Sequence, residues 1–139
     1  ADIIVLPEYC DVPADCGSKS AFHSAIEKYN STVKEAARAA ARRCRSIVFF
    51  NAADKTPTGW RNTTYALDRC GAVVGKYYKA HPAPSEVKRE CEGGNELDVS
   101  YSYEARGADV IEIEGIRFGF MTCYDFYFYE AFLLYYDYI

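Results

Sequence analysis

The chain has 139 residues, of which 50% are hydrophobic and 26% are charged, a composition typical of a single folded globular domain. Its net charge of −4 at pH 7 argues against a nucleic-acid-binding protein, which would present a basic surface. No apolar run approaches the roughly 20 residues of a membrane-spanning helix, and no signal peptide precedes the first apolar strand. We therefore expect a cytoplasmic protein that binds neither membranes nor nucleic acids.

The six cysteines form no C-x-x-C pair, so neither a zinc knuckle nor a thioredoxin-like motif is expected. A chain of this length can bury a core without disulfide bonds, and we interpret the cysteines as mostly reduced thiols. Their positions are Cys10, Cys16, Cys44, Cys70, Cys91 and Cys123.

The first third of the chain predicts a β–α–β order. Residues 2–7 are apolar without alternation, as in a buried strand, and residues 46–51 repeat that pattern. Between them, residues 20–43 place apolar side chains at steps of three and four, which predicts a long helix capped by Ser18 or Ser20. This order is typical of a layered α/β fold.

The remainder of the chain predicts two antiparallel hairpins. The paired strands are residues 60–68 with 72–78, and residues 108–113 with 116–122. A turn is expected over 52–59, a long loop over 79–99, and a helix from Phe128 onward. A loop of about twenty residues in a compact domain is usually functional.

Three predicted strands end at a polar group that can take part in chemistry. Glu8 follows the first strand, Lys79 follows the strand over 72–78, and Cys123 follows the strand over 116–122. Sites in open α/β sheets form beyond strand ends. A carboxylate, an amine and a thiol together supply a base, a cation and a nucleophile, which suffice for acyl transfer.

The stretches LPEY, GKYYKAHP and RFGFMTCYDFYFYE, in this order, resemble the nitrilase superfamily of carbon–nitrogen hydrolases. RNTTYALD is similar to the strand that precedes the lysine in that family. The resemblance runs from Ile3 to about Glu130. It implies a four-layer αββα sandwich, of which residues 1–139 represent about half, as a partial domain truncated at both ends.

The resemblance assigns the catalytic triad to Glu8, Lys79 and Cys123. Cys123 would attack an amide, carbamoyl amine or nitrile to form a thioester, and Glu8 would move the protons. Lys79, kept charged by nearby carboxylates, and the backbone N–H of Tyr124 would stabilise the oxyanion. The substrate would be a small molecule, and neither a cofactor nor a metal is expected.

Further family positions map less directly. Glu86 fits the second glutamate that positions the substrate or the lysine, and Glu92 is the alternative. His81 matches the family's K-x-H pattern, where a structural role is expected, and Asp125 is expected to make local hydrogen bonds. Tyr129 stands where the family usually has proline.

A second class of function remains open, in which the chain is a truncated, non-catalytic member that serves binding or assembly. Thiol reactivity separates the two classes, because a catalytic Cys123 should be alkylated faster, and at lower pH, than the other cysteines. A homo-oligomer is expected, with the aromatic segment 132–136 as a natural contact.

Overall fold

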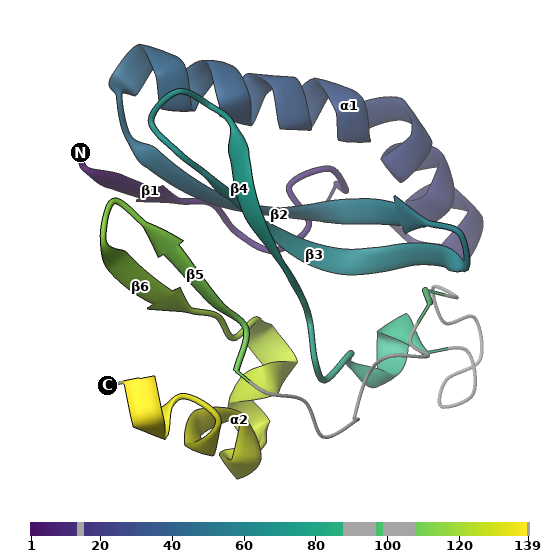
Figure 1. Ribbon diagram of the computed structural model, residues 1–139. Coiled ribbons are helices and arrows are strands. Elements are labelled where there is room, and N and C mark those ends of the chain that lie inside the picture. Colours follow the sequence, from purple (N-terminus) through teal and green to yellow (C-terminus); the bar gives the residue numbers. More distant parts are fainter. Residues whose placement is uncertain (14–15, 88–96, 99–107, 139) are drawn as a thin grey trace.

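The computed structural model describes residues 1–13, 16–87, 97–98 and 108–138, and it contains one long helix and two sheets (Figure 1). The long helix is α1 (Lys19–Cys44). The first sheet has the order β1 (Ile3–Val5), β2 (Ile47–Thr56), β3 (Gly59–Leu67) and β4 (Val73–Tyr78). The second is the hairpin of β5 (Val110–Ile113) and β6 (Ile116–Gly119). β1 pairs parallel to β2, and the other pairs are antiparallel.

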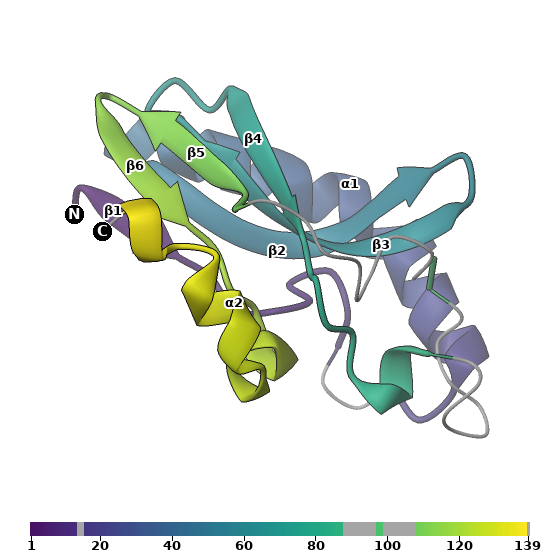
Figure 2. The ribbon, with the colours of Figure 1, turned by 60° about the horizontal axis from the view of Figure 1, so that its bottom comes forward.

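The elements form an α–β–β stack, with α1 on one face of the four-stranded sheet and the β5–β6 hairpin on the other (Figure 2). The alternation of β2 explains both contacts, because successive side chains of a strand point to opposite faces. Val48 and Phe50 pack with Ala37 and Ala41 of α1. Phe49 packs toward the hairpin, with its ring centroid 5.0 Å from that of Phe118.

The predicted helix over 20–43 is confirmed to within one residue at each end. Ser18 is the N-cap, and its side chain accepts a hydrogen bond from the backbone N–H of Ala21, which satisfies one of the free donors of the first turn. Arg45, which has a left-handed backbone, is the C-cap. Arg42 and Arg43 lie in the last turn, where cations interact favourably with the helix dipole.

Two predictions in the first half need correction. The strand predicted as buried over 2–7 spans only Ile3–Val5 and lies at the sheet edge, where Val5 is 73% exposed. The turn predicted over 52–59 is confined to residues 57–58, because β2 continues to Thr56. Asp54 lies within this predicted turn, but in the structure it is inside the sheet, where it accepts a hydrogen bond from Tyr65 and forms an ion pair with Lys76.

Both predicted hairpins are present, although β6 ends at Gly119 rather than at residue 122. The helix predicted from Phe128 onward is broken into two short pieces, the helix α2 (Tyr129–Leu133) and the 3₁₀ helix η3 (Tyr136–Tyr138). A further 3₁₀ helix, η2 (Cys123–Tyr127), precedes them. The loop predicted over 79–99 contains the 3₁₀ helix η1 (Pro84–Glu86), and most of its remainder lies outside the described residues.

The hairpin packs closely against the main sheet at Gly75 of β4. A Cβ atom placed there would lie 2.5 Å from Cδ1 of Ile111 and 2.8 Å from its Cγ1 and Cγ2 atoms. The whole Ile111 side chain would have to move, so any larger residue at this position separates the two layers.

We therefore expect Gly75→Ala to lower the free energy of unfolding by about 1–3 kcal/mol, the usual cost of overpacking a well-filled core. Urea denaturation followed by circular dichroism measures it. Gly17→Ala is the matched control, because a Cβ atom added at Gly17 would meet no other atom within 4 Å. Equal stability of the two variants would contradict this description of the packing between layers.

Candidate active site

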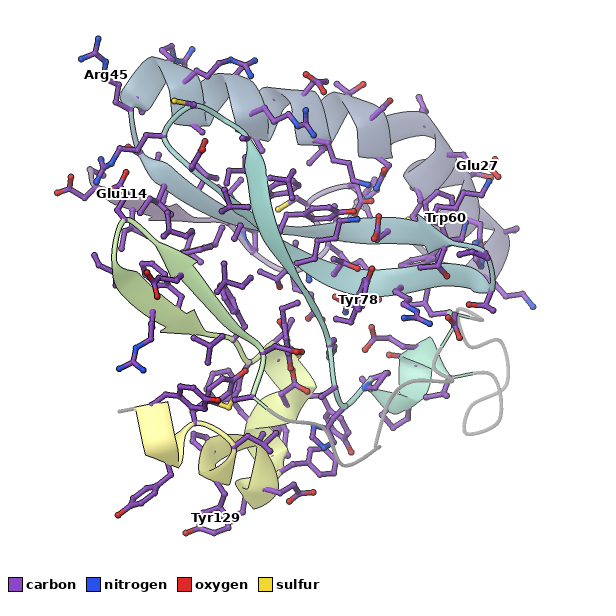
Figure 3. All side chains as sticks on the ribbon, viewed as in Figure 1. Glu27, Arg45, Trp60, Tyr78, Glu114 and Tyr129 are labelled. Carbon is purple, nitrogen blue, oxygen red and sulfur yellow. The ribbon has the colours of Figure 1, made fainter. Side chains whose placement is uncertain are left out.

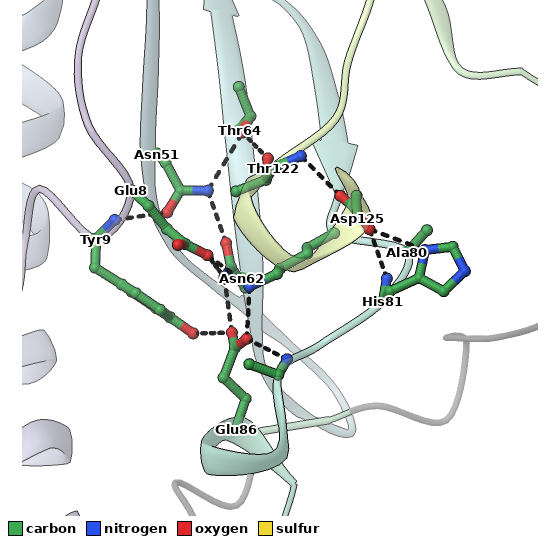
Figure 4. Close-up of polar contacts among 12 residues, drawn as sticks. Glu8, Tyr9, Asn51, Asn62, Thr64, Ala80, His81, Glu86, Thr122 and Asp125 are labelled. Carbon is green, nitrogen blue, oxygen red and sulfur yellow. Dashed lines mark hydrogen bonds and ion pairs between the residues drawn. The ribbon is translucent and has the colours of Figure 1, made fainter. Parts of the chain in front are cut away.

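Lys79 is the centre of the polar cluster beyond the end of β4. Its side chain is only 1% exposed, and its ammonium donates to Glu8 Oε1 at 2.8 Å and to Glu86 Oε2 at 2.7 Å (Figure 4). The backbone N–H of Lys79 donates to the carbonyl of Asn62 on the neighbouring strand at 3.0 Å. The β3–β4 pairing thus fixes where the lysine side chain begins, and the two carboxylates fix where it ends.

The charges of this cluster stabilise one another. Burial opposes the charged form of Lys79, but attraction to Glu86 and hydrogen bonds to both carboxylates together raise its pKa. Burial likewise opposes the charged form of Glu86, yet its pKa is lowered by Lys79 and by hydrogen bonds from Tyr9 and Asn62. Lys79 and Glu86 are therefore both charged at neutral pH.

Glu86 is held from several directions at the end of η1. The backbone N–H of Ala83 donates to Glu86 Oε2 at 2.7 Å, and Asn62 Nδ2 donates to Glu86 Oε1 at 2.7 Å. The Tyr9 hydroxyl also donates to Glu86 Oε1. Of the two candidates for the second glutamate, the structure brings Glu86 into contact with Lys79, and Glu92 lies outside the described residues.

Cys123 begins η2 in a left-handed backbone conformation, with φ of 47°. This region is costly for a residue with a side chain and is maintained only where the surroundings enforce it. Asp125, which is fully buried, supplies part of that enforcement. Its carboxylate accepts from the Thr122 backbone N–H at 2.8 Å, the Tyr77 hydroxyl at 2.8 Å and the His81 backbone N–H at 2.7 Å.

The His81 ring contacts Asp125 rather than the lysine cluster. Its Nδ1 lies 3.0 Å from Asp125 Oδ1, and its ring stacks on Phe128 with 3.9 Å between centroids. These contacts join the segment after Lys79 to the segment after Cys123. Asp125 makes the local hydrogen bond expected of it, with Thr122, but its contacts with Tyr77 and His81 join distant parts of the sequence. Tyr129, where proline is usual in the family, begins α2 and projects outward (Figure 3).

The three residues singled out in the sequence converge on shared cavities. One cavity of about 690 Å³ is lined by Glu8, Lys79, Glu86 and Cys123 together with Tyr9 and several apolar residues. A second, of about 490 Å³, is also lined by Glu8 and Cys123 and extends over Phe49, Phe118 and Phe120. The structure thus places a thiol, a carboxylate and an ammonium around one space.

The acidity of the thiol differs from the expectation. Burial raises the pKa of Cys123, and the negative charge of Glu8 raises it further, while Lys79 opposes the increase. This environment therefore favours alkylation of Cys123 at higher pH than that of an ordinary cysteine, not at lower pH. At neutral pH Cys123 is mainly a thiol beside a carboxylate, so a base is needed to form the thiolate.

Sequence reasoning did not single out the neutral residues that organise this cluster. Asn51 and Thr64 are register partners on the face of the sheet that also carries Phe49, and Asn62 lies two residues before Thr64 on β3. The one signal in the sequence was the alternation, since the face of β2 and β3 that packs on the hairpin changes from apolar to polar side chains at these positions.

The family model of the carbon–nitrogen hydrolases matches residues 1–137. The chain therefore belongs to the carbon–nitrogen hydrolase family. Comparison of the sequence with curated proteins gives no match.

Solved structures share the fold. The carbon–nitrogen hydrolase of Helicobacter pylori G27 aligns with a TM-score of 0.70 and 19% identity over 94% of this chain and 42% of that one. The C. elegans NitFhit protein aligns at 0.70 and 20%, over 94% and 32%. A variant of the amidase from Nesterenkonia sp. AN1 aligns at 0.61 and 18%, over 96% and 48%. The chain adopts about half of the nitrilase-type α/β fold and spans less than half the length of each of these structures.

Because the charge of Glu8 raises the pKa of Cys123, we expect Glu8→Gln to shift the alkylation midpoint of this thiol to lower pH, by about 1 unit. The rate of iodoacetamide modification of the Cys123 peptide, followed by mass spectrometry from pH 6 to 10, measures the shift. Glu112→Gln, at an exposed position of β5, is the control and should leave the midpoint unchanged. An unchanged or higher midpoint in Glu8→Gln would show that the carboxylate does not act on the thiol.

Proposed function

We propose that the protein of which this chain is part hydrolyses a non-peptide carbon–nitrogen bond through a thioester on Cys123. The observation that carries the proposal is the buried Lys79 ammonium, held at 2.8 and 2.7 Å by Glu8 and Glu86 beside the cavity that Cys123 lines. A cation is costly to bury, and this one is directed at the space where an oxyanion would form.

In the first half of the reaction, Glu8 takes the proton of the Cys123 thiol and the thiolate attacks the carbonyl carbon of an amide or carbamoyl amine. With a nitrile, the thiolate adds to the nitrile carbon, and the resulting thioimidate takes up one water and releases ammonia to reach the same thioester. For an amide, the negative charge that develops on oxygen is stabilised by Lys79 and by the backbone N–H of Tyr124. When the carbon–nitrogen bond breaks, the proton on Glu8 passes to the departing amine or ammonia, and the acyl group remains on sulfur.

In the second half, Glu8 accepts a proton from water, and the hydroxide attacks the thioester carbon. The carbon–sulfur bond breaks, the carboxylic acid leaves, and the proton returns to the Cys123 sulfur. The raised pKa of this thiol supports the use of a base in the first half. Glu86 touches Lys79 rather than Cys123 in this arrangement, and it acts by holding the ammonium in place.

Amides, carbamoyl amines and nitriles are the proposed substrate classes. One structural neighbour, the Nesterenkonia amidase variant, is described with acrylamide added to its active-site cysteine. That adduct supports the use of acrylamide as the first electrophile with which to test the reactivity of Cys123.

We expect Cys123→Ala to lower hydrolysis by about 10⁴-fold or more while leaving substrate affinity nearly unchanged, because the sulfur supplies chemistry rather than binding. Ammonia release across the three substrate classes measures activity, and equilibrium dialysis measures binding. Cys44→Ala is the control, since Cys44 ends α1 and is exposed. Hydrolysis that persists in Cys123→Ala would show that another group performs the reaction.

The same measurements decide the alternative, in which the chain serves binding or assembly without catalysis. That alternative predicts no hydrolysis by the native protein and a reaction of Cys123 with acrylamide that is no faster than that of Cys44.

We also propose that the protein self-associates through the apolar surface around α2. Several large side chains there are exposed, among them Phe126, Tyr127, Tyr129, Phe132, Leu133 and Tyr136. Surface patches of this kind mark interaction sites in soluble proteins.

Among the residues that the structure describes, none of the helices has the length and apolar character of a membrane span.

We expect the native protein to sediment as an oligomer and the double variant Phe132→Glu with Leu133→Glu as a smaller species, because buried carboxylates would oppose the contact. Sedimentation velocity at several concentrations measures the change. A native protein that stays monomeric, or a double variant that associates equally, would contradict the proposal.

A further inference from the structure

We propose that Asn62 is a positioning residue of this site, a fixed double donor that holds Glu8 and Glu86 on either side of Lys79. Its Nδ2 donates to Glu8 Oε1 and to Glu86 Oε1, both at 2.7 Å (Figure 4). A side-chain amide nitrogen has two protons, so both are used on the two carboxylates. The inference rests on the proposed function for its catalytic meaning, and on these contacts for its geometry.

The orientation of the Asn62 amide follows from its neighbours. The backbone N–H of Tyr9, which can only donate, lies 2.8 Å from Asn51 Oδ1. The other end of the Asn51 amide must then be Nδ2, and it donates to Asn62 Oδ1 at 2.7 Å and to Thr64 Oγ1 at 3.2 Å. This leaves Asn62 Nδ2 facing the carboxylates. The backbone N–H of Tyr9, next to Glu8, therefore determines the direction of every hydrogen bond in this series.

Asn62 also fixes the third charged residue, through its backbone. Its carbonyl accepts the backbone N–H of Lys79 at 3.0 Å. Asn62 is only 1% exposed and lies inside β3, so neither its backbone nor its side chain can move without disturbing the sheet. One residue therefore contacts Glu8, Lys79 and Glu86, although these three come from different segments of the sequence.

A neutral donor is suited to this position. Two carboxylates around one ammonium leave an excess negative charge, and a donor that adds no charge stabilises both ionised forms. The hydrogen bond from Asn62 is one of the contacts that lower the pKa of Glu86. An apolar residue of similar size would fill the space but would leave both carboxylates without this donor.

The test is Asn62→Leu, in the intact protein. We expect kcat/KM to fall about 100-fold, mainly through kcat, because small displacements of reacting groups carry costs of this size. We also expect the Glu86 carboxyl to titrate at higher pH than in the native protein. Carbon-13 NMR of glutamate-labelled protein measures this titration without requiring activity, and Glu86→Gln assigns the signal.

The matched control is Asn30→Leu. Asn30 Nδ2 likewise donates to a carboxylate, Asp11 Oδ2, and to the Ala53 carbonyl, both at 2.7 Å, but Asn30 lies on α1 and lines neither cavity. A purely structural role for Asn62 predicts that the two variants lose activity in parallel and that the Glu86 titration stays unchanged. That result would overturn the inference.

The inference can still be tested if the variant does not fold or if the native protein is inactive. Should Asn62→Leu fail to fold, Asn62→Ser is the second variant, because its single hydroxyl proton cannot serve both carboxylates. We expect kcat to fall and the Glu86 midpoint to rise in Asn62→Ser as well, and native values for both would overturn the inference. Should the native protein hydrolyse none of the substrates, the proposed function fails. The titration then decides the inference by itself: a higher Glu86 midpoint supports it, and an unchanged midpoint overturns it.

Discussion

The burial of one ammonium group governs the arrangement of this site. Removing Lys79 from water carries a large desolvation cost, which is offset only when opposite charges and hydrogen bonds are placed accurately around it. Glu8 and Glu86 supply the charges at 2.8 and 2.7 Å, and Asn62 joins the two carboxylates from the other side. The need to keep Lys79 charged therefore constrains the positions of three separate segments of the chain, those that carry Glu8, Lys79 and Glu86.

Cys123 belongs to a second cluster of contacts, which is joined to the first through the sheet. The Asp125 carboxylate accepts hydrogen bonds from Thr122, Tyr77 and His81. Thr122 Oγ1 lies 3.2 Å from Thr64 Oγ1, which also accepts from Asn51. Both Tyr9, next to Glu8, and Cys123 adopt left-handed backbone conformations, with φ of 54° and 47°. Strain at two such positions, enforced by buried hydrogen bonds, is typical of functional sites.

The sequence predicted the elements whose signal is local. The 3.6-residue period from Ser20 to Arg43, its cap and both hairpins are present. The errors arose where tertiary contacts override local preference. Asp54 is a turn former, but in β2 its charge is met by Lys76, and the sheet continues. The C-terminal helix is interrupted where the Tyr135 hydroxyl bonds to the backbone of Phe120.

For the site, the order of the motifs predicted Glu8, Lys79, Glu86 and Cys123, because the charged and reactive residues carry the resemblance. Asn62 was not singled out, since a neutral amide in a strand has no chemical signal of its own, and its role arises only from what the register places beside it. The direction of the Cys123 pKa shift was also beyond the sequence, because it depends on the distance to Glu8 and on burial.

The central claim is that an acyl group passes through the sulfur of Cys123, and trapping that intermediate tests it most directly. The protein would be mixed with an amide substrate, quenched in acid within the first turnover, and analysed by mass spectrometry of its peptides. We predict that the Cys123 peptide gains the mass of the acyl group and loses it on treatment with hydroxylamine. Release of ammonia with no acyl group on Cys123 at any time during the turnover would contradict the claim.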